Sequence, residues 1–61
     1  MLKTFVVWVY DNEKEEMVAI EGEYSGPRKL LTKRLLTIGI WSGQEWFPPQ
    51  TILKLIEKED S

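Results

Sequence analysis

Apolar side chains recur at alternating positions near the N-terminus, and this pattern predicts a β-strand. Residues 3–10 are rich in β-branched and aromatic side chains, which suit a pleated, half-buried surface. Both faces of the segment are apolar, with Phe5, Val7 and Val9 on one and Val6, Trp8 and Tyr10 on the other. A strand of this kind is expected to be central in its sheet, or to have its outer face covered.

Residues 17–24 form the second predicted strand. Val18, Ile20 and Tyr24 share one face, whereas Glu21 and Glu23 mark the solvent face. The polar segment 11–16 opens with turn-forming residues, so the two strands are predicted to form an antiparallel hairpin.

Residues 28–36 follow Ser25-Gly26-Pro27, which end the second strand. They are compatible with two structures, a helix and a strand. As a helix, the segment has Pro27 near its first turn, and Leu31 and Leu35 lie one helical turn apart. As a strand, it directs Leu36, Ile38 and Ile40 inward.

A second hairpin is predicted from a turn at Ser42-Gly43 between aromatic-bearing strands at residues 37–41 and 45–47. Pro48 and Pro49 lack an N–H group and end the strand pairing. For residues 51–59 the apolar stripe favours a short C-terminal helix, although the acids at its end oppose the helix dipole.

Length and composition limit the classes of function. The 61 residues predict a single domain, 1–61. The absence of His and Cys removes the usual general base, the soft metal ligands and the strongest nucleophile. We therefore expect a non-enzymatic protein with no catalytic residue, no metal site and no cofactor.

The net charge of −2 argues against a generic nucleic-acid coat. The longest apolar run, residues 5–10, is far shorter than the ~20 residues of a membrane helix. The N-terminal segment also lacks the apolar core and cleavage site of a signal peptide. These features predict no membrane partner and a cytoplasmic location.

Basic residues are concentrated in one segment. Four of the eight Lys and Arg residues lie between Tyr24 and Gln44, where there is no acid: Arg28, Lys29, Lys33 and Arg34. Together with Trp41 they are candidates for holding phosphates and stacking a base. The simpler interpretation is a solvated face that balances the acids of the neighbouring hairpin.

Three Trp residues are more than a core of this size easily buries. Tyr10, Trp41 and Trp46 are therefore candidate binding residues, because Trp and Tyr are enriched at interface hot spots. Packing in the core is the alternative for Trp41 and Trp46. Trp8 and Tyr10, on the second apolar face of the first strand, suggest a homodimer that would cover them.

Two short segments resemble SH3-like small β-barrels. Val9-Tyr10-Asp11 is similar to the Ala-Leu-Tyr-Asp-Tyr segment of that family, and Phe47-Pro48-Pro49-Gln50 before residues 52–56 resembles its Phe-Pro-Ser-Asn-Tyr-Val close. The resemblance implies a five-stranded barrel with a single turn before its last element, and a peptide groove at Tyr10 and Pro48. This chain departs from the family at Thr51, which stands near the expected Tyr, and the paired Trp of the family is absent.

The predicted fold is therefore mainly β, a small antiparallel SH3-like barrel with a C-terminal turn or short helix. The alternative is an α+β fold, an antiparallel sheet with a helix over residues 28–36. The predicted function is a small binding module acting through protein–protein interaction. The alternative is a nucleic-acid-binding module that uses the basic 28–34 segment and Trp41.

Overall fold

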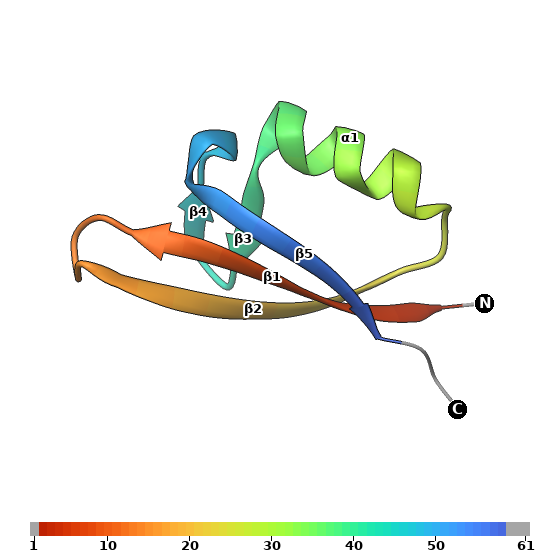
Figure 1. The fold of residues 1–61 in the computed structure, drawn as a ribbon, viewed down its shortest axis with the longest axis horizontal. Helices are drawn as coiled ribbons and strands as arrows, with labels where there is room; N and C mark the ends of the chain where they lie inside the picture. Colours follow the sequence, from red (N-terminus) through yellow and green to blue (C-terminus); the bar gives the residue numbers. More distant parts are fainter. Residues whose placement is uncertain (1, 59–61) are drawn as a thin grey trace.

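The computed structural model describes residues 2–58 and contains one three-stranded sheet, one two-stranded sheet and one α-helix (Figure 1). In chain order the elements are β1 Lys3–Asp11, β2 Glu16–Tyr24, α1 Arg28–Ile38, β3 Ile40–Ser42, β4 Glu45–Phe47, the 3-10 turn η1 Pro49–Thr51 and β5 Ile52–Lys58. The larger sheet has the order β2-β1-β5, and β3 pairs with β4. The structure thus confirms a mainly β, antiparallel architecture.

The hairpin of β1 and β2 forms as predicted from the alternating pattern. The two strands pair antiparallel over their full length, from Lys3 opposite Tyr24 to Asp11 opposite Glu16. The Asp11 side chain holds the turn, because its Oδ1 accepts backbone hydrogen bonds from Glu13 at 3.0 Å and Lys14 at 3.2 Å. This is the local bonding that makes Asp a turn former.

The C-terminal segment corrects the prediction of a short helix over residues 51–59. Residues 52–58 form the strand β5, which pairs antiparallel with β1 and has a register shift between Trp8 and Val9; Glu59 lies outside the described residues. The second edge of β1 would otherwise present unpaired backbone groups, and pairing satisfies them. Lys3 Nζ also approaches Glu57 Oε1 at 3.4 Å across this pair.

The segment after Pro27 forms α1, so the helix that was the alternative for residues 28–36 is present. It runs on to Ile38, which corrects the prediction of a strand over residues 37–41; β3 begins only at Ile40. The helix ends at Gly39, whose N–H donates to Leu35 O at 2.9 Å and whose φ is 90°. Such a φ favours glycine, and it turns the chain sharply into β3.

The second hairpin forms at the predicted turn. β3 and β4 pair through Trp41 opposite Trp46 and Ser42 opposite Glu45. Gly43 has a positive φ of 63°, whereas the φ of Gln44 is not positive. A positive φ at the first central residue alone is the pattern of a type II′ turn, which suits the twist of a two-residue hairpin.

The core lies on one face of the larger sheet, where α1 and the β3–β4 hairpin cover it (Figure 1). Two leucines of α1, Leu31 and Leu35, pack there, and burial of each contributes about 1.5–3 kcal/mol. The remaining buried apolar side chains come from the strands: Phe5, Val7, Val9, Ile20, Ile40 and Phe47. Over residues 2–58 the strands form two separate sheets rather than one closed barrel.

Candidate functional site

The two tryptophans of the β3–β4 hairpin are surface residues. Trp41 and Trp46 lie directly opposite one another, with exposed fractions of 60% and 48%. Core packing, the alternative considered for both, therefore does not apply. Large exposed aromatic side chains are costly to leave in water, so the hairpin is a candidate contact surface.

Trp46 is fixed in position by the end of α1. Its indole Nε1–H donates to Ile38 O at 2.8 Å, and this carbonyl belongs to the last residue of the helix, which has no partner within the helix. Gly39 permits the close approach, because a Cβ at that position would stand 2.2 Å from Phe47 O and 3.0 Å from Trp46 Nε1. The hydrogen bond to Ile38 thus fixes the position of the indole ring, while much of the Trp46 side chain stays exposed.

A groove runs beside Trp46, and we call it the Tyr10–Trp46 groove. It is an open concavity of about 200 Å³ where the end of β1, the following loop, β4 and η1 meet. Tyr10, which is 37% exposed, and Pro48 contribute further apolar surface. The described residues that line it are Tyr10, Asp11, Asn12, Glu13, Glu45, Trp46, Phe47, Pro48 and Thr51.

The charge of this groove is negative. Asp11, Glu13 and Glu45 line it, and none of the Lys and Arg residues within residues 2–58 does. Asp11 is only 4% exposed, and within residues 2–58 its Oδ2 has no hydrogen-bond partner. The exposed carboxylates of Glu13 and Glu45 at the rim attract a cationic group to the groove.

A second concavity lies on the other side of the hairpin, and we call it the Arg34–Trp41 cleft. It has a volume of about 260 Å³ and is bounded by α1, the end of β2 and β3. Arg34 and Trp41 line it together with Glu23, Tyr24 and Ile38. Among the described residues, Arg34 is the base that lines this cleft, beside the exposed side chain of Trp41.

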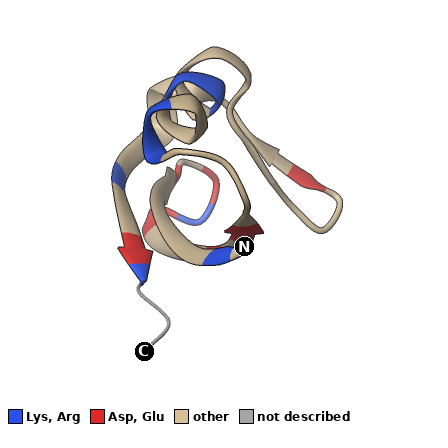
Figure 2. Ribbon diagram, turned by 90° about the vertical axis from the view of Figure 1, so that its right-hand side faces the viewer, with Lys and Arg blue, Asp and Glu red and all other residues tan. Residues whose placement is uncertain are grey.

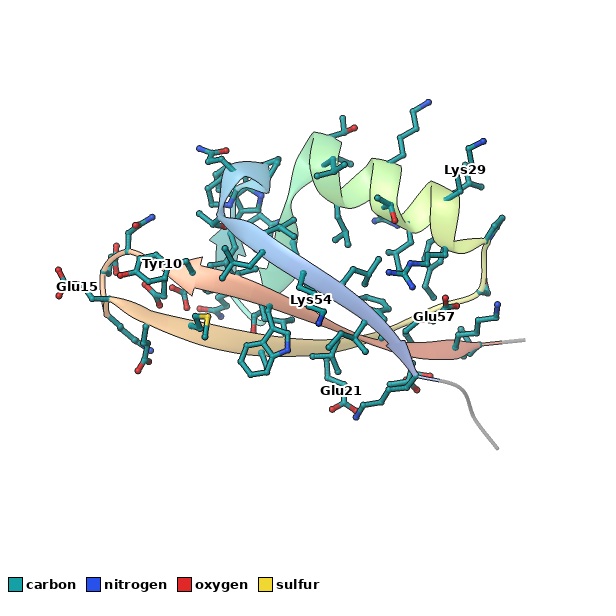
Figure 3. The ribbon with its side chains drawn as sticks, viewed as in Figure 1. Tyr10, Glu15, Glu21, Lys29, Lys54 and Glu57 are labelled. Carbon is teal, nitrogen blue, oxygen red and sulfur yellow. The ribbon has the colours of Figure 1, made fainter. Side chains whose placement is uncertain are left out.

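The four basic residues predicted as a patch all lie on α1, which carries the blue segments of the helix in Figure 2, but their side chains have different neighbours. Arg28 Nη2 donates to Leu55 O of β5 at 3.0 Å, whereas Arg34 lines the cleft beside β2. One guanidinium group thus bonds to β5 and the other lines a cleft beside β2, and these two strands are opposite edges of the sheet. Lys29, labelled in Figure 3, and Lys33 are exposed on the outer surface of α1.

The structure therefore separates the sequence-predicted residues into two sites. Tyr10 and Trp46 share one groove, and Trp41 and Arg34 share the other cleft. Sequence reasoning missed Glu13 and Glu45 as members of a binding surface. Both acids lie next to predicted turns, and this could have marked them as surface residues. No local sequence pattern indicates that the β1–β2 loop and the β3–β4 hairpin lie side by side.

Comparison with known proteins adds no assignment, since no family model, curated protein or solved structure matches this chain. Within residues 2–58 no cluster of three or more Asp or Glu side chains is placed to hold a metal ion. No helix in the same range has the length and apolar character needed to cross a bilayer.

Proposed function

We propose that this chain is a non-enzymatic binding module that holds an extended segment of another protein in the Tyr10–Trp46 groove. The observation that carries the proposal is the convergence of Tyr10, Trp46 and Pro48 on one acid-rimmed concavity. Exposed aromatic rings next to a proline offer flat apolar surfaces for a ligand, and rigid aromatic side chains lose little entropy on binding.

The chemistry of the groove favours a particular ligand. A proline or other apolar residue of the ligand would contact Tyr10, Trp46 and Pro48, as in the recognition of polyproline-type segments by aromatic grooves. A neighbouring Arg or Lys would meet Glu13 and Glu45, and Arg would also stack on the exposed Trp46 ring. The proposed ligand is therefore a short, extended, basic segment that contains proline.

The resemblance to SH3-like small barrels supports the same proposal. It implied a single turn before the last element, and η1 stands directly before β5. It also implied a groove at Tyr10 and Pro48, which both line the concavity described above. We propose that the chain is a variant of that architecture in which α1 separates the first hairpin from the second.

The test uses two synthetic peptides, one with alternating Pro and Arg residues and one with Glu in place of each Arg, titrated into isotopically labelled protein. We expect the basic peptide to shift the backbone resonances of Tyr10, Glu13 and Trp46 in a saturable manner. Glu45→Lys should weaken binding about tenfold or more, since the rim charge is reversed. Lys29→Glu, on the outer surface of α1, serves as the control and should leave it unchanged.

Two results would contradict this proposal. Equal binding of the acidic peptide would show that the rim charges do not select the ligand. Saturable shifts confined to α1 and Trp41 would place the ligand in the Arg34–Trp41 cleft instead.

The second candidate is a nucleic-acid-binding module that uses Trp41 and the basic 28–34 segment. It is favoured by the shared position of Arg34 and Trp41 in one cleft. Stacking of a base on Trp41 would make Trp41→Ala cost about 1–3 kcal/mol in affinity for single strands. Titration with a single-stranded oligonucleotide at rising salt tests it, because phosphate contacts lose affinity steeply with salt. Absence of binding at low salt removes this candidate.

A further inference from the structure

Within residues 2–58 no helix or hairpin covers the face of the larger sheet that points away from α1; its centre is apolar, and we call it the outer face. The register of the strands arranges it in rows across β2, β1 and β5. The row through Val6 holds Glu21 and Ile56, and the row through Trp8 holds Ala19 and Lys54. Ile56 is 38% exposed and Trp8 is half-buried, while α1 and the β3–β4 hairpin cover only the opposite face (Figure 1).

The charges on this face are sorted by strand. The acids lie on β2, at Glu21 and Glu23, and the bases lie on β5, at Lys54 and Lys58. Figure 3 shows Glu21 on the side of the sheet away from α1. The central strand β1 carries only uncharged side chains on this face. The outer face therefore has an apolar centre with one acidic and one basic margin.

A surface of this kind is complementary to itself in one orientation. If a second copy is related by a two-fold axis that runs along β1, its β5 lies over β2 of the first copy. Glu23 then faces Lys58 of the partner subunit, because both occupy the row of Thr4. The two Trp8 side chains meet at the axis.

The other face-to-face orientation has its axis across the strands and is unfavourable. It places β2 over β2 and β5 over β5, so that acids meet acids and bases meet bases. Within one chain, Glu21 and Lys58 approach only to 4.0 Å and both are well exposed, so this contact competes weakly with contacts to a second copy.

We infer that the outer face is a dimer interface between two copies of this chain, with the two-fold axis along β1. The inference is independent of the proposed ligand of the Tyr10–Trp46 groove. In this arrangement the strands of the two sheets run in nearly the same direction, as in aligned sheet packing. Both grooves then lie at the same end of the dimer, where a bivalent ligand could reach them.

The size of the face indicates a reversible dimer. Nine residues of β1 and a width of three strands give roughly 400 Å² of projected area per subunit. Stable interfaces bury about 800 Å² of accessible surface per partner. We therefore expect a dimer that dissociates on dilution, rather than an obligate one.

The experiment is sedimentation analysis of the purified chain from low micromolar to millimolar concentration. We expect a concentration-dependent rise from the 7.2 kDa monomer towards twice that mass. Glu23→Lys and Lys58→Glu should each raise the dissociation constant about tenfold, since each places like charges across the interface at two symmetric points. Both residues are exposed, so thermal unfolding should show that the variants remain folded.

Mixing the two variants is the decisive step. In the mixed dimer every altered charge faces an opposite charge, so an equimolar mixture should dimerise nearly as well as the parent chain. Glu16→Lys makes the same change of net charge at the far end of β2, in the row of Asp11 on the core side of the sheet, and should have no effect.

Two outcomes overturn the inference. A constant 7.2 kDa species up to millimolar concentration would show that the outer face does not self-associate. A dimer that Glu23→Lys leaves unchanged or strengthens would show that the axis does not run along β1.

Discussion

Trp46 Nε1 donates a hydrogen bond to Ile38 O at 2.8 Å and so joins the second hairpin to the end of the helix. The bond places a ring that is 48% exposed at a fixed point beside the groove. One side chain thus serves both the fold, through its N–H, and the candidate site, through its aromatic face.

Trp46→Phe tests the structural part of this role. The substitution keeps an aromatic ring but removes the donor to Ile38 O, and we expect a loss of about 0.5–1.5 kcal/mol in the free energy of unfolding. Trp41→Phe is the matched control, because Trp41 lies opposite Trp46 on the same hairpin and its indole N–H has no hydrogen-bond acceptor within residues 2–58. Urea denaturation measures both, and equal losses would contradict the assigned role of the Trp46 N–H.

Gly39→Ala should be strongly destabilising. The φ of 90° at Gly39 alone costs a residue with a Cβ about 1–3 kcal/mol. The new Cβ would also overlap the carbonyl oxygen of Phe47 at 2.2 Å, so that β4 must move away from the helix. Thermal unfolding gives the measurement.

Gly43→Ala is the control for that overlap. Gly43 also has a positive φ, 63°, but a Cβ there would meet no atom within 4 Å in the described part of the chain, apart from its chain neighbours. We expect only the conformational cost of roughly 1–2 kcal/mol. A Gly43 variant that is less stable than the Gly39 variant would show that the close contact with Phe47 is not limiting.

Glu15→Gly should stabilise the chain. Glu15 has a φ of 54°, in the left-handed region that favours glycine. Relief of this strain should outweigh the greater freedom of glycine in the unfolded chain and give a net gain of about 0.5–1 kcal/mol. The neighbouring Glu16→Gly, inside β2, should instead lose about 0.5–1 kcal/mol. The same sign for both variants in chemical denaturation would argue against strain at Glu15.

Asp11→Ala should loosen the loop between β1 and β2. It removes the acceptor of the Glu13 and Lys14 backbone N–H groups, and we expect a cost of about 1–3 kcal/mol. Amide hydrogen exchange should show faster exchange at these two positions. Asp11→Asn keeps an oxygen acceptor and should retain their protection, so equal exchange in both variants would contradict the assigned bonds.

The sequence by itself determined the first hairpin, the turn at Gly43 and the end of strand pairing at Pro48. These features depend on local rules: the two-residue period of a half-buried strand, the bonding of Asp11 to its own turn, and the missing N–H of proline. It also indicated Tyr10 and Trp46 as binding candidates, because the chain contains more large aromatic side chains than a small core can bury.

Only the tertiary structure decided the state of residues 28–38 and 52–58. The apolar residues of both segments satisfy a helical and a strand period, so local pattern could not choose between them. In the first segment the covering of the sheet selected a helix that buries Leu31 and Leu35. In the second, the free edge of β1 selected a strand, because its backbone groups needed partners.

The candidate site, too, could not be predicted from local sequence patterns. Tyr10 and Trp46 stand far apart in the chain and line one groove because β5 returns to β1 and brings η1 and β4 beside its end. Their acidic rim comes from two different hairpins. A groove of this kind arises from the pairing of distant backbone segments, and no local periodicity records such pairing.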